Sequence, residues 1–289
     1  MKVTEKCSSR GDRPVFICDF SPPRAADPDA LENAIEIDAD FICVAYAPGR
    51  AVRVDSAMLA YSIKHKTGKD VIFNLATRDM NKLALQSHLL GAQMVGLENV
   101  VIVKGDAFAG RDLSRVKDVS DFTPTELIAA LDSMNRGTDF RGSRLGSPTD
   151  FCVGASIDLG RGVEREAALT HRKVLSGADF FITQPVFSTQ EIAAFFDAYR
   201  AISNEGIPRP VFYGLQVLVK DGVIFSSVPE GTRQELERGR DGTDIALEML
   251  RSFLDFGIKY IYLVPPILRG GARDYVAARK VLEAARDTS

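Results

Sequence analysis

The segments best suited to chemistry follow short apolar runs of the sequence. Lys104-Gly105-Asp106 comes directly after Val100–Val103 and combines a cation, a glycine and a carboxylate. The carboxylate could bind a cationic or hydrogen-bonding ring, and the glycine allows a ligand to approach the backbone closely. Thr183-Gln184-Pro185 ends the run Phe180–Thr183 with an amide that both donates and accepts hydrogen bonds, which suits the edge of a heterocycle. Both segments predict contacts with a ring-bearing ligand.

Cationic residues at two other places could bind an anion. In His171-Arg172-Lys173, within a helical stretch, Arg172 and Lys173 could neutralise a phosphate. A solvated helix face explains the same residues and is the favoured interpretation on the sequence alone. Arg269-Gly270-Gly271 stands where barrels often bind phosphate, although a tight turn explains it equally well. Neither segment has the G-x-G-x-x-G or Walker A pattern, so nucleotide binding of those kinds is not predicted.

The composition excludes several classes of function. Lys and Arg number 36 against 39 Asp and Glu, a formal net charge of -3, so no domain-wide positive field attracts nucleic acid or anionic lipid. The four cysteines form no C-x-x-C pair and the three histidines have no zinc spacing. Residues 1–13 lack the apolar core of a signal peptide, and no run of about 18 apolar residues could span a membrane. We therefore expect a reduced, cytoplasmic protein without a metal site.

Eight apolar runs rich in Val, Ile and Phe alternate with stretches of helical period. The expected strands are Val15–Phe20, Phe41–Tyr46, Val71–Leu75, Val100–Val103, Phe151–Ala155, Phe180–Thr183, Val211–Leu215 and Tyr260–Val264. The expected helices are Asp27–Ile37, Ser56–Lys66, Asn81–Val95, Pro124–Asn135, Arg161–Leu175, Ser188–Ile202, Asp244–Phe256 and Arg273–Ala285. Almost continuously apolar strands are typical of a parallel sheet covered on both faces.

Eight βα units in 289 residues predict an α/β fold of the (β/α)8 TIM-barrel type. We expect one catalytic domain over residues 1–289, with an N-terminal extension over residues 1–13. An open doubly wound sheet is the alternative, because periodicity does not separate the two architectures.

A barrel would gather the polar residues that end its strands at one rim, where barrel active sites lie. These residues include Asp19, Ser21, Tyr46, Asn74, Thr77, Arg78, Asp79, Lys104, Gly105, Asp106, Ser156, Asp158, Gln184, Gln216 and Arg269. Helix capping explains any one of them about as well as chemistry does, but it explains the whole ring much less well.

Six segments, each short, occur in an order and at spacings that are specific together. They are Asp19-Phe-Ser-Pro-Pro-Arg24, Ala76-Thr-Arg-Asp-Met-Asn81, Gln86-Ser-His-Leu-Leu-Gly91, Lys104-Gly-Asp106, Arg172-Lys173 and Gly177-Ala-Asp-Phe-Phe-Ile-Thr-Gln-Pro185. Over residues 14–215 the chain thereby resembles the methylenetetrahydrofolate reductase family. The stretch from Ala76 to Gly91 most resembles the form that is fused to, or accompanies, homocysteine methyltransferases.

The resemblance implies a (β/α)8 barrel that binds FAD and acts in one-carbon metabolism and methionine biosynthesis. The implied reaction interconverts 5,10-methylenetetrahydrofolate and 5-methyltetrahydrofolate by hydride transfer. Asp19 then stands at the position of the family's glutamate acid, and Asp106 contacts the pterin near the flavin. The implied flavin-binding residues are Tyr46, Asn74, Lys104, Gly105, Asp106, Arg172 and Lys173, and the implied substrate-binding residues are Gln184, Gln216 and Arg269.

Two departures from the family pattern leave other functions open. Asp19 is one methylene shorter than Glu, and a proton donor must come within roughly 3 Å of its target. The segment 216–221 lacks the phenylalanine that helps the family hold NAD(P)H, so the alternative electron donor is a partner flavoprotein or iron–sulfur protein.

Two alternatives to the reductase therefore stand. The first is a tetrahydrofolate-binding component of a methyl-transfer or demethylation system without hydride transfer, and the second is a non-catalytic subunit of a reductase complex. For the reductase we expect a folate substrate, a homo-oligomer, and no nucleic-acid or membrane partner.

Overall fold

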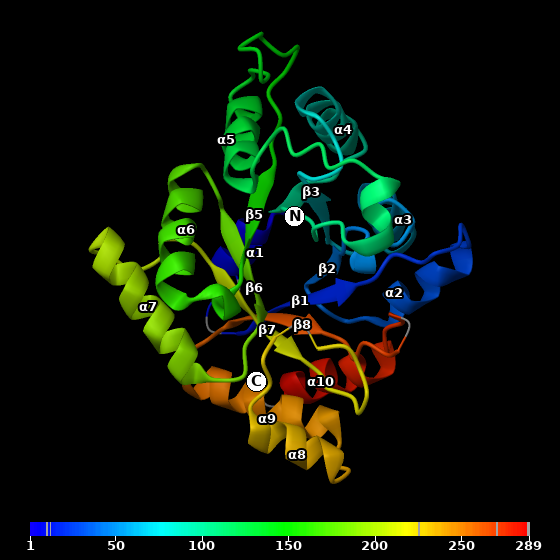
Figure 1. Cartoon of the computed structure of the whole chain (residues 1–289), viewed down its shortest axis with the longest axis vertical. Coiled ribbons are helices and arrows are strands. Elements are labelled where there is room, and N and C mark those ends of the chain that lie inside the picture. Colours follow the sequence, from blue (N-terminus) through cyan, green and yellow to red (C-terminus); the bar gives the residue numbers. More distant parts are fainter. Residues whose placement is uncertain (10, 12, 225, 270, 288–289) are drawn as a thin grey trace.

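The strands close into a ring. The computed structural model describes residues 1–9, 11, 13–224, 226–269 and 271–287. All neighbouring strands pair in parallel in chain order, and the last strand pairs with the first (Figure 1). They are β1 (Val15–Phe20), β2 (Phe41–Val44), β3 (Val71–Ala76), β4 (Asn99–Val103), β5 (Cys152–Ile157), β6 (Phe180–Pro185), β7 (Val211–Gln216) and β8 (Tyr260–Val264). The predicted (β/α)8 barrel is confirmed, and the open sheet is excluded.

Helices surround this ring on its outer side (Figure 1). They are α2 (Glu32–Glu36), α3 (Ser56–Thr67), α4 (Lys82–Met94), α5 (Pro124–Asn135), α6 (Val163–Leu175), α7 (Thr189–Ser203), α8 (Glu230–Glu237), α9 (Gly242–Asp255) and α10 (Tyr275–Asp287). Short 3-10 helices are η1 (Pro28–Leu31), η2 (Pro48–Arg50), η3 (Gly110–Ser114) and η4 (Leu159–Arg161). In the described part of the chain, no helix is long and apolar enough to cross a membrane.

The strands are buried on both faces, as their continuous apolar sequences predict. One apolar cluster fills the space between strands and helices, with Phe73 and Leu263 among its members. A second cluster fills the inside of the barrel, with Ile17, Phe41 and Val101 among its members. Helix boundaries follow local capping: Thr123 and Glu126 form a capping box at the start of α5.

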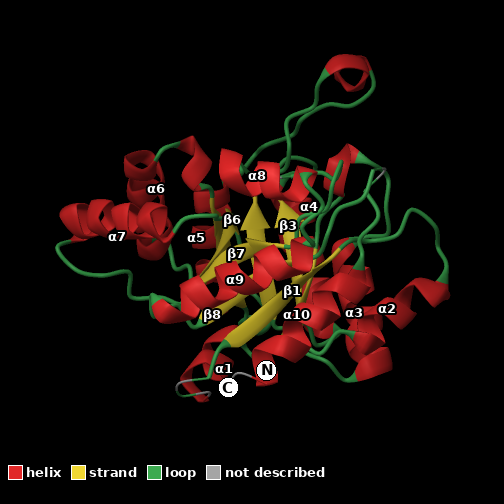
Figure 2. Ribbon diagram, turned by 90° about the horizontal axis from the view of Figure 1, so that it is seen from below, coloured by secondary structure: helices red, strands yellow, loops and turns green. Residues whose placement is uncertain are grey.

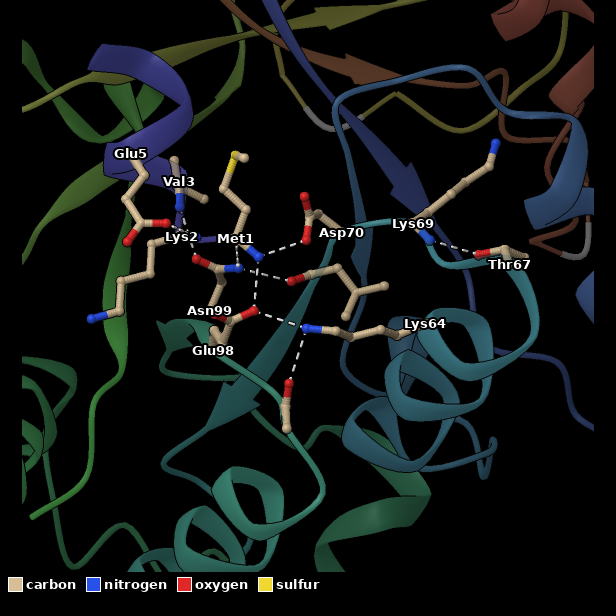
Figure 3. A network of polar contacts seen from close by, with 12 residues as sticks. Met1, Lys2, Val3, Glu5, Lys64, Thr67, Lys69, Asp70, Glu98 and Asn99 are labelled. Atoms are coloured by element: carbon tan, nitrogen blue, oxygen red, sulfur yellow. Dashed lines mark hydrogen bonds and ion pairs between the residues drawn. The ribbon is translucent and has the colours of Figure 1, made fainter. Parts of the chain in front are cut away.

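A helix that the sequence did not predict closes the end of the barrel where the strands begin. α1 (Val3–Ser9) lies within residues 1–13, at the end of the barrel opposite the tips of the strand arrows (Figure 2). Its Val3 and Cys7 belong to the interior cluster. The Met1 amino group donates to carboxylates of Asp70, at 2.7 Å, and Glu98, at 2.8 Å (Figure 3). These contacts hold α1 against the barrel, which leaves the carboxyl ends of the strands as the open side.

Differences from the predicted boundaries are small. The expected helix 27–37 is split into η1 and α2, because Asp27 caps the 3-10 turn that Pro28 begins. β5 and β6 each continue two residues beyond their predicted ends, so Ser156 and Gln184 belong to the strands themselves.

Candidate functional site

A cavity of about 780 Å³ opens at the carboxyl ends of the strands. This volume lies within the range of roughly 300–1,000 Å³ that is usual for ligand sites. Nine of the residues predicted to form the site line this cavity: Asp19, Tyr46, Asn74, Lys104, Gly105, Asp106, Arg172, Lys173 and Gln184. Residues from the first, second, third, fourth and sixth strand ends and from α6 thus share one cavity.

Gln216 and Arg269, both predicted to bind substrate, do not line this cavity. Gln216 is buried and donates from Nε2 to the carbonyl of Val223, at 2.8 Å. The Arg269 side chain is 79% exposed and pairs with Asp221.

Arg273 enters the cavity in place of Arg269. The chain after β8 folds back on itself, with an antiparallel bridge between Ile267 and Arg273 and a hydrogen bond from Leu268 N to the Ala272 carbonyl. Arg269 lies at the outer turn of this loop and Arg273 at its returning end. The sequence did not single out Arg273, because nothing in the local pattern marks where the loop turns.

Asp19 is a buried carboxylate with partners on both oxygens. Oδ1 accepts from the Tyr262 hydroxyl at 2.9 Å, and Oδ2 accepts from Nε of Arg273 at 3.1 Å. The side chains of Arg273 and Asp19 are only 3% and 5% exposed. Burial, reinforced by Asp19, raises the pKa of Tyr262 well above its ordinary value, so its hydroxyl keeps the proton that it donates. Because both of its oxygens accept hydrogen bonds, Asp19 is an oriented acceptor at the cavity wall.

Several polar groups that line the cavity are available to a ligand. The side chains of Lys104, Asp106 and Gln184 make no hydrogen bond to the described residues, and all three line the cavity. Asn74 accepts a weak hydrogen bond at Oδ1 from Cys43 Sγ, at 3.4 Å, which leaves its amide nitrogen as a donor. Together they present donors and acceptors that suit nitrogen heterocycles.

The backbone conformation at position 105 requires a glycine. Its φ is +84°, and a Cβ there would lie 3.2 Å from the Cβ atoms of Ala76 and Arg78. Any side chain would be strained and would fill space beside the cavity. This position therefore allows the flat face of a ligand to approach the backbone.

Arg78 organises the loops after β3 and β4. Its Nε and Nη2 bind the two carboxylate oxygens of Asp79 at 2.6 and 2.7 Å, and Nη1 donates to the Asp106 carbonyl. The guanidinium also lies over the Phe108 ring, 4.1 Å from its centroid. Asp79 in turn binds the hydroxyl of Tyr46, whose pKa is raised by burial and by this carboxylate. The rim residues Tyr46 and Asp106 are thereby held in place.

The wall formed by α6 is strongly cationic. Arg165, Arg172 and Lys173 all line the cavity, at helical spacings that put them on one face. Arg161, just before α6, joins them and pairs with Asp158 at 2.8 Å. The structure thus turns Arg172 and Lys173 toward the cavity, although a solvated helix face was the favoured interpretation of the sequence. Such a wall can neutralise a diphosphate.

Lys173 is the most buried of these cations, at 4% exposed. Its Nζ donates to the carbonyl of Ser156. Burial, helped by Arg161 and Arg172 and opposed by Glu166, lowers the pKa of Lys173 to about 8. An anionic ligand would offset this loss of hydration and favour the protonated amine.

The described residues contain no group of three or more His, Cys, Asp or Glu side chains placed to hold a metal ion. All four cysteines are buried and free.

Comparisons with known proteins agree with the resemblance in the sequence. The family model described as methylenetetrahydrofolate reductase matches residues 6–219. Among solved structures, an uncharacterized protein from Clostridium thermocellum that binds two copies of 5-methyl-5,6,7,8-tetrahydrofolic acid is similar, with a TM-score of 0.69. The similarity covers 99% of each chain at 15% sequence identity, which establishes a shared fold.

Proposed function

Since this chain belongs to the methylenetetrahydrofolate reductase family, we propose that it interconverts 5,10-methylenetetrahydrofolate and 5-methyltetrahydrofolate by hydride transfer through bound FAD. The observation that carries the proposal is the convergence of nine residues of the predicted site on one cavity of about 780 Å³. The folate bound by the similar clostridial protein supports the class of substrate.

The residues present fit FAD. The cations of α6, Arg165, Arg172 and Lys173, would bind its diphosphate. Asn74 and Lys104 would donate hydrogen bonds to the ring system, and Gly105 lets that ring approach the backbone. When bound, the flavin supplies reversible hydride acceptance, which no side chain of the protein can provide.

The chain's own residues would orient the folate and balance its charge. The Gln184 amide and the Asp106 carboxylate would bind the pterin edge, since both groups face the cavity without a hydrogen-bond partner among the described residues. Asp19, fixed by Tyr262 and Arg273, would stabilise the positive charge that develops when the imidazolidine ring opens to an iminium. This assignment modifies the acid role inferred from the sequence, because both oxygens of Asp19 already accept hydrogen bonds.

The proposal is tested by the visible spectrum of the purified protein after reconstitution with FAD, followed by anaerobic addition of 5-methyltetrahydrofolate. We expect the flavin band to bleach. A protein that binds 5-methyltetrahydrofolate but cannot be loaded with FAD would contradict the proposal and leave a hydride-free folate-binding role. Stopped-flow mixing of the loaded protein with NADH or NADPH then identifies the donor: reduction as fast as turnover excludes a partner protein.

The α6 wall is tested by Arg172→Ala. We expect the dissociation constant for FAD to rise about 10-fold, the scale of one charge-assisted hydrogen bond. Arg251→Ala is the matched control, because Arg251 is an exposed arginine on α9 away from the cavity. Equal FAD retention by the two variants would show that Arg172 does not bind the diphosphate.

A further inference from the structure

Strand β6 is irregular where it borders the cavity. It pairs in parallel with β7, its neighbour in the ring (Figure 1). Ile182 and Pro185 stand three positions apart in β6, but their partners in β7 stand only two positions apart. At this point β6 therefore has one residue more than β7, and Thr183 with Gln184 forms a β-bulge. We call these two residues the β6 bulge.

The β6 bulge changes which side chains face the cavity. Before the bulge the side chains alternate, since Phe180 and Ile182 belong to the interior cluster and Phe181 belongs to the outer one. Continued alternation would place Val186 inside the barrel, but Val186 belongs to the outer cluster. The consecutive residues Ile182–Pro185 all line the cavity, which a regular strand does not allow. The bulge thus shapes this part of the cavity wall.

The hydroxyl of Thr183 closes the bulge. The N–H of Gly214 donates to Thr183 Oγ1 at 2.9 Å, at a point where a main-chain carbonyl accepts in a regular parallel ladder. The same hydroxyl donates to the carbonyl of Gln184 at 2.7 Å. Thr183 is buried, so loss of its hydroxyl would leave the Gly214 N–H without this acceptor. One side chain therefore holds both strands at the bulge.

Gly214 leaves the room that the bulge needs. A Cβ at this position would lie 2.7 Å from the Gln184 carbonyl oxygen and 2.7 Å from the Pro185 nitrogen. Both are backbone atoms, which cannot turn aside as the end of a flexible side chain can. Any side chain at position 214 would therefore displace the peptide between Gln184 and Pro185. Beyond this peptide, the Ser226 hydroxyl donates to the Pro185 carbonyl at 2.7 Å.

We propose that Thr183 and Gly214 are positioning residues that hold the Gln184 amide in place for the folate ring. The inference rests on the proposed function, in which Gln184 binds the pterin edge. The backbone of the bulge is fixed by these contacts, whereas the Gln184 side chain faces the cavity without a hydrogen-bond partner among the described residues. Hydrogen bonds weaken steeply when their geometry departs from the optimum, so a shift of the bulge would cost the contact with the ligand.

The test measures binding of 5-methyltetrahydrofolate and of FAD by titration calorimetry. Thr183→Val keeps the branched shape of the side chain and removes its hydroxyl. We expect Thr183→Val and Gln184→Ala each to raise the dissociation constant for 5-methyltetrahydrofolate about 10-fold and to leave FAD binding unchanged. The double variant should bind no more weakly than Gln184→Ala, because Thr183 acts through Gln184. Thr183→Ser, which keeps the hydroxyl, should bind as the parent protein does.

A second variant tests the bulge from β7. Gly214→Ala should cause the same selective loss of folate affinity, and this loss should vanish in the Gln184→Ala background; it carries the test if Thr183→Val does not fold. Thr67→Val is the matched control. The Thr67 hydroxyl also donates to a main-chain carbonyl and accepts from a main-chain N–H, at 2.7 and 3.1 Å. Thr67 ends α3 and does not line the cavity, so its variant should bind both ligands normally.

Other outcomes overturn the inference in distinguishable ways. Unchanged folate binding by Thr183→Val, or additive losses in its double variant with Gln184→Ala, would show that Thr183 does not act through Gln184. Failure of both Thr183→Val and Gly214→Ala to fold would assign the bulge to stability alone. A parent protein that binds the folate but not FAD would contradict hydride transfer and leave the inference standing. A parent protein that binds neither ligand would overturn both.

Discussion

Removing the guanidinium of Arg273 should destabilise the protein through the carboxylate that remains. Arg273→Met keeps an unbranched side chain of similar reach. Among the described residues, it leaves the Tyr262 hydroxyl as the hydrogen-bond donor to the Asp19 carboxylate. Breaking a buried ion pair by removing one partner costs about 3–5 kcal/mol, since the other charge stays buried. Both side chains are at most 5% exposed, so the pair belongs to this class. Because Tyr262 still donates, we expect the lower end, about 3 kcal/mol.

A second substitution separates lost charge balance from lost packing. Asp19→Asn in the Arg273→Met background removes the unpaired charge while keeping an oxygen that Tyr262 can reach. We expect the double variant to recover most of the lost stability. The coupling energy of the complete cycle should then be about 2 kcal/mol or more.

The assay is equilibrium urea unfolding at pH 7, followed by far-UV circular dichroism and by tyrosine fluorescence, with coincident transitions required. Arg269→Met serves as the control: its side chain is 79% exposed, so the variant should stay within about 0.5 kcal/mol of the parent protein. The reasoning is refuted if Arg273→Met loses less than about 1 kcal/mol, or if Asp19→Asn fails to restore stability in that background.

Two further predictions concern Gly105 in the cavity lining and Lys173 in the α6 wall. The φ of Gly105 is +84°, and a Cβ there would lie 3.2 Å from two other Cβ atoms. Gly105→Ala should therefore lower the free energy of unfolding in urea by about 1–3 kcal/mol and weaken FAD binding. An unchanged free energy of unfolding together with an unchanged FAD affinity would contradict the argument that a ligand approaches the backbone at Gly105. The pKa of Lys173, about 8 in the folded protein, lies below the ordinary lysine value of 10.5, so the unfolded chain binds more protons between these values. Unfolding free energy should therefore rise from pH 8 toward 10.5 by up to about 3 kcal/mol more in the parent protein than in Lys173→Met. Parallel pH profiles would show that burial does not depress this pKa.

The strands could be predicted because their signal is local. A parallel barrel strand is covered on both faces, so nearly every residue of runs such as Val15–Phe20 must be apolar, and the run is visible without knowledge of its neighbours. Polar residues at the ends of such runs then share one rim by topology. This is why Asp19, Asn74 and Asp106 could be assigned to one site in advance.

Helix α1 could not be predicted in the same way. Only Val3 and Cys7 are buried in its seven residues, too few to set a helical period. Its docking depends on carboxylates distant in the sequence, Asp70 and Glu98, which meet the Met1 amino group once the barrel has closed.

The sequence by itself determined the fold class, the family and nine of the residues that line the cavity, because hydrophobic periodicity and short motifs report local burial and strand ends. The tertiary structure alone decided which groups face one another: Arg273 instead of Arg269 lies beside Asp19, and Arg172 lines the cavity. The physical reason is that loop paths depend on contacts between distant segments, such as the bridge of Ile267 with Arg273 and the reach of Arg53 to the Pro22 carbonyl. Such contacts leave no periodic trace in the sequence, yet they decide which side chains line the cavity.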